Sequence, residues 1–367
     1  MGTIITIAIF LGVLFVLILV HEWGHYIVAK LTGMRVDEFA IGFPPKLVSW
    51  KRGETEYSLN AIPVGGFVRI YGEDSTQVAE QNVDQKRAFG ARPKWAQALV
   101  LVAGVTMNVI FAWFLFILIL LIGVPTQVEE GVASAAAELV VMGVLPGSPA
   151  DGVLPPHVTI VSVRSGEVAL ERLTPATLSD LMASATESVT VGYVIGDASP
   201  VTVEVTPVKG LLAASPDRAA VGVSLSLVET ISMPLLSAIP EAARQTVHTT
   251  GKIAAGLYAL LAGAVVGTAD FSQVAGPVGI VSYVGDAAAI GFTSLLLFTA
   301  IISLNLAVIN LLPIPALDGG RLVFVAIETI LRRPIPPVWA ARVNLTGFLF
   351  LMLLMLAATV SDVTKFF

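Results

Sequence analysis

Four long stretches without a charged residue dominate the pattern of apolar and polar positions along this chain of 367 residues. They cover residues 2–20, 95–124, 292–313 and 343–360. A helix needs about 20 residues to cross the hydrocarbon core of a bilayer, so each stretch is long enough, or nearly so, to span a membrane. The pattern predicts a polytopic α-helical membrane protein with four transmembrane helices.

The stretch between the first two spans has the pattern of a small sheet. Residues 39–50 and 56–62 are strand-like and are joined by the turn Lys51-Arg52-Gly53-Glu54, and residues 67–71 form a further strand. Residues 275–280 contain a Gly-Pro turn that we expect to be a loop.

A second stretch, between the second and third spans, has the composition of a soluble domain. Val-rich strands at 158–163, 189–195 and 201–205 accompany a short helical stretch at 175–185. The predicted segments are therefore the first span (1–34), a β region (35–94), the second span (95–125), an inserted α+β domain (128–228), a connecting region (229–290), the third span (291–320), a polar segment (321–342) and the fourth span (343–361).

Composition supports a membrane protein and excludes several kinds of site. The chain is 55% hydrophobic and 13% charged, whereas soluble domains are roughly 25% charged. There is no cysteine, which excludes disulfides, thiolate metal sites and a cysteine nucleophile. No basic cluster alternates with aromatic residues, so we expect no nucleic-acid partner.

The distribution of basic residues orients the predicted spans. Cytoplasmic loops of membrane proteins carry an excess of Lys and Arg. Basic residues precede the second span and follow the third, so both regions are expected to be cytoplasmic and the inserted domain extracytoplasmic. The residues are Lys86, Arg87, Arg92 and Lys94, and then Arg321, Arg332, Arg333 and Arg342.

Candidate chemistry lies at the end of the first span, in the sequence His21-Glu22-Trp23-Gly24-His25. On a helix, His21 and His25 lie one turn apart on one face and can bind one Zn²⁺, while Glu22 can take a proton from the attacking water. A catalytic zinc has three protein ligands and one open position. Asp318, at the end of the third span, reaches the same cytoplasmic side and is the expected third ligand.

The same topology constrains the uncharged stretch 253–269. If this stretch crossed the membrane, Asp318 would reach the side opposite to the two histidines. We therefore expect 253–269 to be an interfacial or re-entrant helix within the extracytoplasmic region 229–290.

These residues form motifs that resemble the site-2 protease family of intramembrane zinc metalloproteases, in particular its bacterial RseP-like branch with a single PDZ domain. The motifs are HExGH, at residues 21–25, and Asn-x-x-Pro-x-Pro-x-x-Asp-Gly, at residues 310–319. The resemblance implies that His21, His25 and Asp318 bind Zn²⁺ and that Glu22 is the general base. It also implies that Asn310 holds the substrate backbone, although a helix-end or turn role for Asn310 is the alternative.

Further segments are similar to other parts of this family. Gly104-x-x-x-Asn108 suggests that Asn108 contacts substrate, with an interhelical hydrogen bond as the alternative. Residues 146–150 resemble a PDZ turn. Residues 57–67 resemble a membrane-associated β-hairpin that binds substrate by strand addition along 57–62. The substrate contacts expected there are Tyr57, Ser58, Leu59, Asn60, Gly65 and Gly66.

The function expected from the resemblance is intramembrane proteolysis with Zn²⁺ as cofactor. The enzyme would cut single-span membrane proteins within or near their transmembrane segments, for example anti-sigma factors or remnant signal peptides. A site-1 protease would act first, and the inserted domain would act as a size filter. The expected location is the bacterial inner membrane, in contact with the lipid bilayer.

Two other classes of protein remain as alternatives. A catalytically silent PDZ scaffold would have no need of Glu22. A metal transporter would need polar residues along several spans, and the spans here carry few.

Overall fold

A computed structural model describes residues 2–73, 85–166, 168–185, 187–196, 198–211, 215–268 and 275–366. The chain forms two compact units. Unit 1 combines Met1–Leu118 with Leu235–Phe367, and unit 2 is the inserted part Ile119–Pro234.

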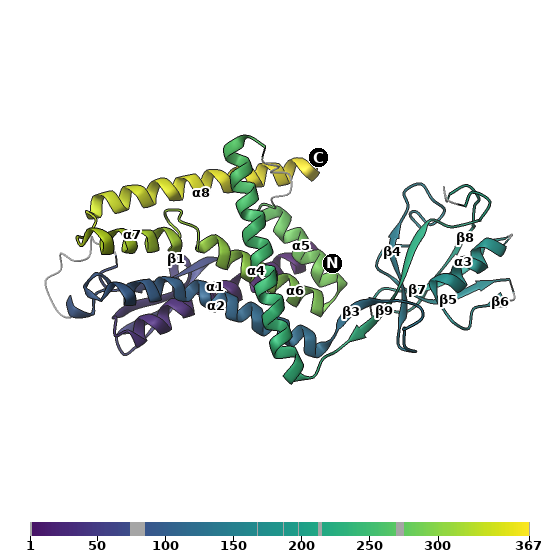
Figure 1. The fold of residues 1–367 in the computed structure, drawn as a ribbon, viewed down its shortest axis with the longest axis horizontal. Helices are drawn as coiled ribbons and strands as arrows, with labels where there is room; N and C mark the ends of the chain where they lie inside the picture. The colour runs from purple at the N-terminus through teal and green to yellow at the C-terminus, as the bar shows by residue number, and fades with distance from the viewer. Residues whose placement is uncertain are drawn as a thin grey trace. The chain divides into compact units, whose positions relative to one another are not determined.

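Four helices of the described residues are long and apolar enough to cross a membrane (Figure 1). The prediction of a polytopic membrane protein is therefore confirmed. The first helix continues to Leu31, well beyond the uncharged stretch, so the HExGH motif lies inside it. These helices are α1 (Thr3–Leu31), α2 (Lys94–Ile122), α6 (Phe292–Asn310) and α8 (Pro337–Phe366).

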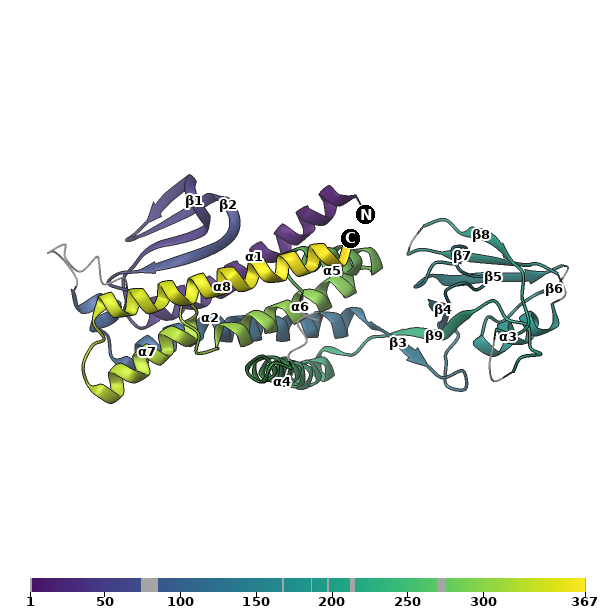
Figure 2. The same cartoon turned by 90° about the horizontal axis from the view of Figure 1, so that it is seen from above.

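A long helix, α4 (Leu235–Val266), begins at the chain's return from unit 2. It runs crosswise to α1, α2 and α8 in Figure 1 and is seen nearly end-on in Figure 2. The indole Nε1 of Trp113 on α2 donates a hydrogen bond of 3.1 Å to the carbonyl of Ile239, next to Pro240 in α4. The stretch 253–266 thus belongs to one helix that does not run along the candidate spans.

A shorter helix, α5 (Pro277–Ile290), was not expected from the sequence, which indicated a loop at its start. It packs against α1, α6 and α8. The backbone N–H of Gly279 donates a hydrogen bond of 2.7 Å to Asp362 on α8. A side chain on Gly276 would lie 2.7 Å from that carboxylate. The Gly-Pro-Val-Gly stretch therefore packs against α8 as the start of a helix and is not a loop.

Two strands, β1 (Val36–Arg52) and β2 (Thr55–Ile70), form a sheet in which each strand contributes two stretches. The register places the stretches in the order 46–52, 55–62, 36–43 and 66–70. Residues 57–59 therefore pair on both sides, with 39–41 and with 48–50. The expectation that 57–62 offers a free edge is wrong, because β1 folds back across Pro44-Pro45 and covers it.

The two outer stretches of the sheet are 46–52 and Gly66–Ile70, and the second of these lies next to the 36–43 stretch. Among the described residues, Gly66–Ile70 pairs only with 36–41. The chain reaches it through Gly65, whose φ of 127° few other residues adopt. A side chain at Gly65 would also lie 2.3 Å from the ring of Phe43.

Charged side chains attach the sheet to α1. The guanidinium of Arg87 donates two hydrogen bonds, of 2.7 and 2.8 Å, to Glu54 in the turn between β1 and β2, and Lys30 at the end of α1 donates one of 2.6 Å. Arg87, and then Lys30, lower the pKa of Glu54 to about 2. The carboxylate is therefore charged at neutral pH and holds the turn against the last residues of α1.

Unit 2 is an α+β domain built on a single sheet. Its strands run in the order β3-β9-β4-β5-β7-β8, and β6 pairs with β5. The predicted strands correspond to β5, β7 and β8, whereas β3, β4, β6 and β9 were missed. Their bounds are β3 Val124–Val128, β4 Glu138–Val144, β5 Thr159–Ser165, β6 Val168–Ala169, β7 Val189–Val194, β8 Val201–Val205 and β9 Val223–Ile231.

One helix, α3 (Pro175–Ser184), packs on this sheet. The hydroxyl of Thr174 accepts a hydrogen bond from the N–H of Thr177, and Pro175 begins the first turn, which together define the start of the helix. Leu178 and Met182 on α3 are buried in the core of unit 2.

Candidate metal centre

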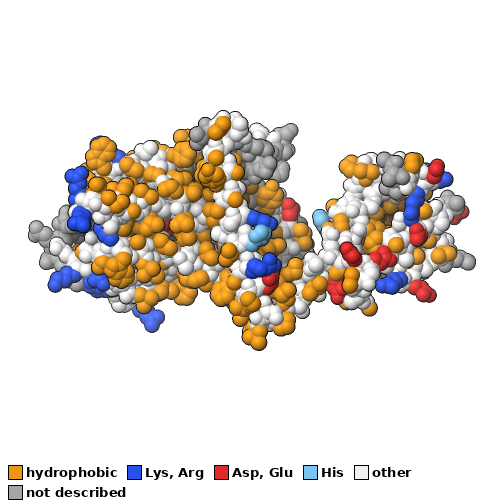
Figure 3. All heavy atoms as spheres, viewed as in Figure 1, with side chains coloured by type: hydrophobic (Ala, Val, Ile, Leu, Met, Phe, Trp, Pro, Cys, Tyr) orange, Lys and Arg blue, Asp and Glu red, His pale blue; other side chains and the backbone are white. Residues whose placement is uncertain are grey.

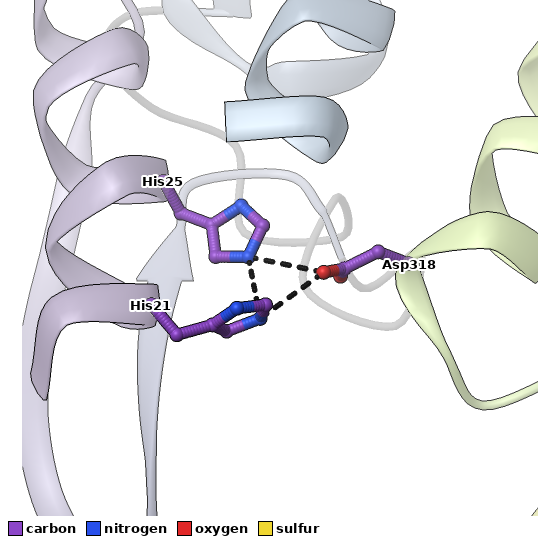
Figure 4. A group of neighbouring side chains, drawn as sticks. All are labelled: His21, His25 and Asp318. Atoms are coloured by element: carbon purple, nitrogen blue, oxygen red, sulfur yellow. Dashed lines mark hydrogen bonds and ion pairs between the residues drawn. The ribbon is translucent and has the colours of Figure 1, made fainter. Parts of the chain in front are cut away.

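Two histidines on α1 and one aspartate on α7 (Asp318–Leu331) converge at one point (Figure 4). Oδ2 of Asp318 lies 3.1 Å from Nε2 of His21 and 3.3 Å from Nε2 of His25. The two Nε2 atoms are 3.3 Å apart. Residues far apart in the sequence thus present three electron-pair donors to a common centre.

This triangle fits a tetrahedral zinc ion. Ligand atoms about 2.0–2.1 Å from one tetrahedral metal lie about 3.3 Å from each other. Oδ2 of Asp318 is buried and has no hydrogen-bond partner within the described residues, which is costly unless a cation satisfies it. In the part of the chain that the structure describes, no other group of three His, Asp or Glu side chains is arranged in this way.

Helix α2 orients both imidazole rings. Nδ1 of His25 lies 2.8 Å from the carbonyl of Val100, so Nδ1 carries the proton and Nε2 keeps its lone pair for a metal. The side-chain nitrogen Nδ2 of the fully buried Asn108 lies 3.3 Å from Nδ1 of His21. When Nε2 of His21 faces a metal, Nδ1 carries the proton, and turning the Asn108 amide over presents Oδ1 as the acceptor of that proton. Oδ1 has no hydrogen-bond partner among the described residues.

Glycines let α1 and α2 approach each other closely. A side chain on Gly104 of α2 would lie 2.4 Å from Nε2 of His25, in the space of the site itself. A side chain on Gly24 of α1 would lie 2.5 Å from the carbonyl oxygen of Ala103. The Gly104-x-x-x-Asn108 element therefore leaves room for the site and supplies the amide that orients His21.

The sequence placed Asp318 at the end of the third span, whereas the structure places it at the start of a separate helix, α7. Helix α6 ends at Asn310, residues 311–317 form a linker, and Asp318 opens a new helix. Side chains on Gly319 and Gly320 would each lie 2.2 Å from a linker carbonyl oxygen. These glycines therefore let the linker pack on α7, and the helix N-terminus favours the charge of Asp318.

Two cavities meet at the candidate site. The first, which we call the metal cleft, has a volume of 290 Å³ and is lined by His21, Glu22, His25, Asp318 and part of the Gly66–Ile70 edge. The second has a volume of 280 Å³ and is lined by Glu22, Gly65, Gly66, Asn108, Asn310 and Asp318, among others. Glu22 lies at the junction of the two.

Four residues expected to contact substrate lie outside these cavities. Ser58 is buried and donates a hydrogen bond of 2.7 Å to Glu38, and the buried Asn60 donates one of 2.9 Å to the carbonyl of Gly42. Tyr57 is bonded to Tyr26 at 2.7 Å between hydroxyls. Leu59 lies on the same doubly paired stretch. We therefore assign Tyr57, Ser58, Leu59 and Asn60 to the sheet and not to the site.

Two charged residues of the metal cleft, Glu73 and Arg321, were not predicted as part of it. Arg321 follows Asp318 by three residues, a spacing that places both on one helix face and that could have indicated its position. Glu73 carried no such signal, because its place depends on the path of the sheet.

Comparison with known proteins identifies the family of the chain. The sequence model of peptidase family M50 matches residues 9–354. The chain belongs to this family. A Clostridium perfringens protein whose name describes a zinc metalloprotease is 36% identical over 355 residues, covering 95% of each chain.

Two further relatives have similar names. The zinc metalloprotease RasP of Oceanobacillus iheyensis is 28% identical over 448 residues and 99% of each chain. The regulator of sigma-W protease RasP of Bacillus subtilis is 29% identical over 443 residues, again 99% of each chain. The expected activity, that of an intramembrane zinc metalloprotease, is confirmed, and the scaffold and transporter alternatives are set aside.

The contact between Asn108 and His21 predicts an effect on metal affinity. Replacing Asn108 with Ala removes the group that orients His21, so zinc affinity should fall about 10- to 100-fold. Competition with a chelator on the purified protein measures this. Asn305→Ala is the matched control, because the Asn305 amide on α6 donates a hydrogen bond of 2.9 Å to the carbonyl of Ile301 in its own helix, and Asn305 lines neither of the two cavities. Equal zinc affinity of the Asn108 variant and the wild type would contradict the assignment.

Proposed function

We propose that His21, His25 and Asp318 hold the zinc ion and that Glu22 is the general base of the protease. The observation that carries this assignment is the triangle of ligand atoms, 3.1–3.3 Å apart, directly beside Glu22 in the metal cleft. When bound, zinc polarises the scissile carbonyl and lowers the pKa of water. Glu22 takes a proton from the attacking water and passes it to the leaving amine.

The substrate binds along the Gly66–Ile70 edge. A transmembrane helix satisfies its own peptide groups, so a segment that unwinds for cleavage needs new hydrogen-bond partners. A free strand edge supplies them by strand addition. A side chain on Gly66 would lie 3.4 Å from Cγ of Glu22 and 2.9 Å from Ile18, so the glycine keeps the space between edge and base open. Asn310, at the end of α6, lines the adjoining cavity and supports the same segment.

The metal cleft lies toward the cytoplasm in this proposal. Lys and Arg side chains gather at one end of unit 1 in Figure 3, beyond a wide apolar surface, and α7 lies at that end in Figure 1. Basic residues favour the cytoplasmic side. Unit 2 follows the opposite end of α2 along the chain, so it is extracytoplasmic, and the membrane is the inner membrane of a bacterium.

Two further elements contact the bilayer surface without crossing it. One is α4, which is interfacial because it runs crosswise to the candidate spans (Figure 1). The other is the end of the sheet formed by residues 43–50 and 59–62, which is membrane-associated because it exposes large apolar side chains. These are Phe43, Leu47, Val48, Trp50, Leu59 and Ile62.

Unit 2 is a PDZ-like domain that acts as a size filter for substrates already shortened by a site-1 protease. A relative in B. subtilis is named for the regulation of sigma-W, which supports single-span regulators such as anti-sigma factors as substrates. Remnant signal peptides have the same chemistry, an apolar helix with a shortened extracytoplasmic end. Deleting 130–227 should let untrimmed substrates be cut.

Glu22→Gln separates metal binding from proton transfer. The amide cannot take a proton, whereas the three ligands stay in place, so cleavage of a membrane-span peptide should fall at least about 100-fold with zinc content unchanged. Zinc content and cleavage are measured on the same purified sample. Full activity of this variant would rule out Glu22 as the base.

Proline in the edge strand tests strand addition. Backbone N–H groups alternate between the two sides of a strand, so one of the two substitutions Phe67→Pro and Val68→Pro removes an outward N–H and leaves pairing with β1 intact. The variant that lacks the outward N–H should keep its thermal midpoint and its zinc content but lose about tenfold or more in kcat/KM. The matched controls are Leu47→Pro and Val48→Pro on the opposite edge of the sheet. Unchanged kcat/KM in both edge variants contradicts substrate binding at Gly66–Ile70.

A further inference from the structure

An ion pair forms part of the lining of the metal cleft. Nη1 of Arg321 lies 2.5 Å from Oε1 of Glu73, and both residues line the cleft. The Glu73 side chain is 13% exposed and that of Arg321 is 36% exposed. Because water is largely excluded from the carboxylate, this pair is screened less than one on an open surface.

Each partner is attached to one wall of the cleft. The N–H of Glu73 donates a hydrogen bond of 3.1 Å to the carbonyl of Ile70, which fixes Glu73 directly after the free edge. In the same turn, Gly72 has a φ of 70°, and a side chain there would lie 2.7 Å from Ala88. Arg321 lies one helical turn beyond Asp318 on the same face of α7. The pair therefore joins the proposed substrate strand to the helix that carries a metal ligand.

A larger cavity lies on the other side of this ion pair. It has a volume of 690 Å³, and its lining includes Phe324, Val325, Pro334, Pro336 and Ala341. It shares Glu73, Leu101 and Arg321 with the metal cleft. The side chains of the ion pair are thus part of the wall that separates the cleft from the larger cavity.

We propose that the Glu73–Arg321 ion pair is an end stop that determines which peptide bond is cut. A substrate segment that pairs with Gly66–Ile70 can extend as far as this pair and no further, which fixes its register relative to the metal. Without the pair, the segment slides into the 690 Å³ cavity and other bonds reach the metal. This inference rests on the strand addition proposed above, and it makes Glu73 and Arg321 positioning residues.

The positions of cleavage test this proposal. A single-span substrate is incubated with the purified full-length enzyme, and the new ends of the products are identified by mass spectrometry. Wild type should cut at one main position. Glu73→Gln and Arg321→Gln should each add cuts displaced by one or more residues. The charge-swapped variant, Glu73→Arg with Arg321→Glu, should return to the main position, because it restores an ion pair between the same two walls.

Lys94→Gln is the matched control. Lys94 pairs at 2.5 Å with Glu328, farther along α7, and neither residue lines the metal cleft. This variant weakens the attachment of α7 without opening the end of the cleft, so its cleavage position should not change. Zinc content and thermal midpoint are measured for every variant, so that loss of the fold is recognised.

Three results would overturn the end stop. They are a single unchanged cleavage position in both Gln variants, an equal spread of positions in Lys94→Gln, and a charge-swapped variant that folds and binds zinc but keeps the spread. A failure of strand addition is seen separately, as full activity of the edge proline variants. The two hypotheses are therefore judged on different measurements.

Discussion

The constraint on which the rest of this structure depends is the contact of two imidazole nitrogens with one buried carboxylate oxygen, all within 3.3 Å. Without a cation, Oδ2 of Asp318 is buried and has no hydrogen-bond partner among the described residues, at a considerable cost in free energy. The surrounding elements are arranged around this contact. Gly104 leaves room for it, Val100 and Asn108 orient the rings, and the linker after α6 delivers Asp318 to the start of a helix.

The membrane setting explains why the site is combined with a sheet. A transmembrane substrate has no free peptide groups until it unwinds, and unpaired groups are expensive in lipid. The Gly66–Ile70 edge lines the same cleft as the metal ligands and offers a free strand edge there. Glu73 and Arg321 then connect the end of that edge to α7. The metal ligands and the edge proposed to bind substrate are thus linked through a few short contacts.

The sequence predicted the parts of this arrangement that local patterns determine. Hydrophobic length gave the four candidate spans, helical spacing paired His21 with His25, and charge asymmetry brought Asp318 to the same side. It failed where long-range pairing decides the outcome. Residues 57–59 look like any amphipathic strand, and only the folding of β1 over them shows that both of their sides are occupied. The start of α5 also looked like a loop, because its partner, Asp362, lies more than 80 residues away along the chain.

The most direct test of the central claim is X-ray absorption spectroscopy at the zinc edge on the purified protein. The account predicts two imidazole nitrogens and one carboxylate oxygen at about 2.0–2.1 Å, with one further light atom completing four-coordination. Asp318→Ala should remove the carboxylate contribution and lower zinc content. A spectrum that lacks two imidazole ligands, or that is the same in wild type and Asp318→Ala, would contradict the claim that α1 and α7 share one zinc ion.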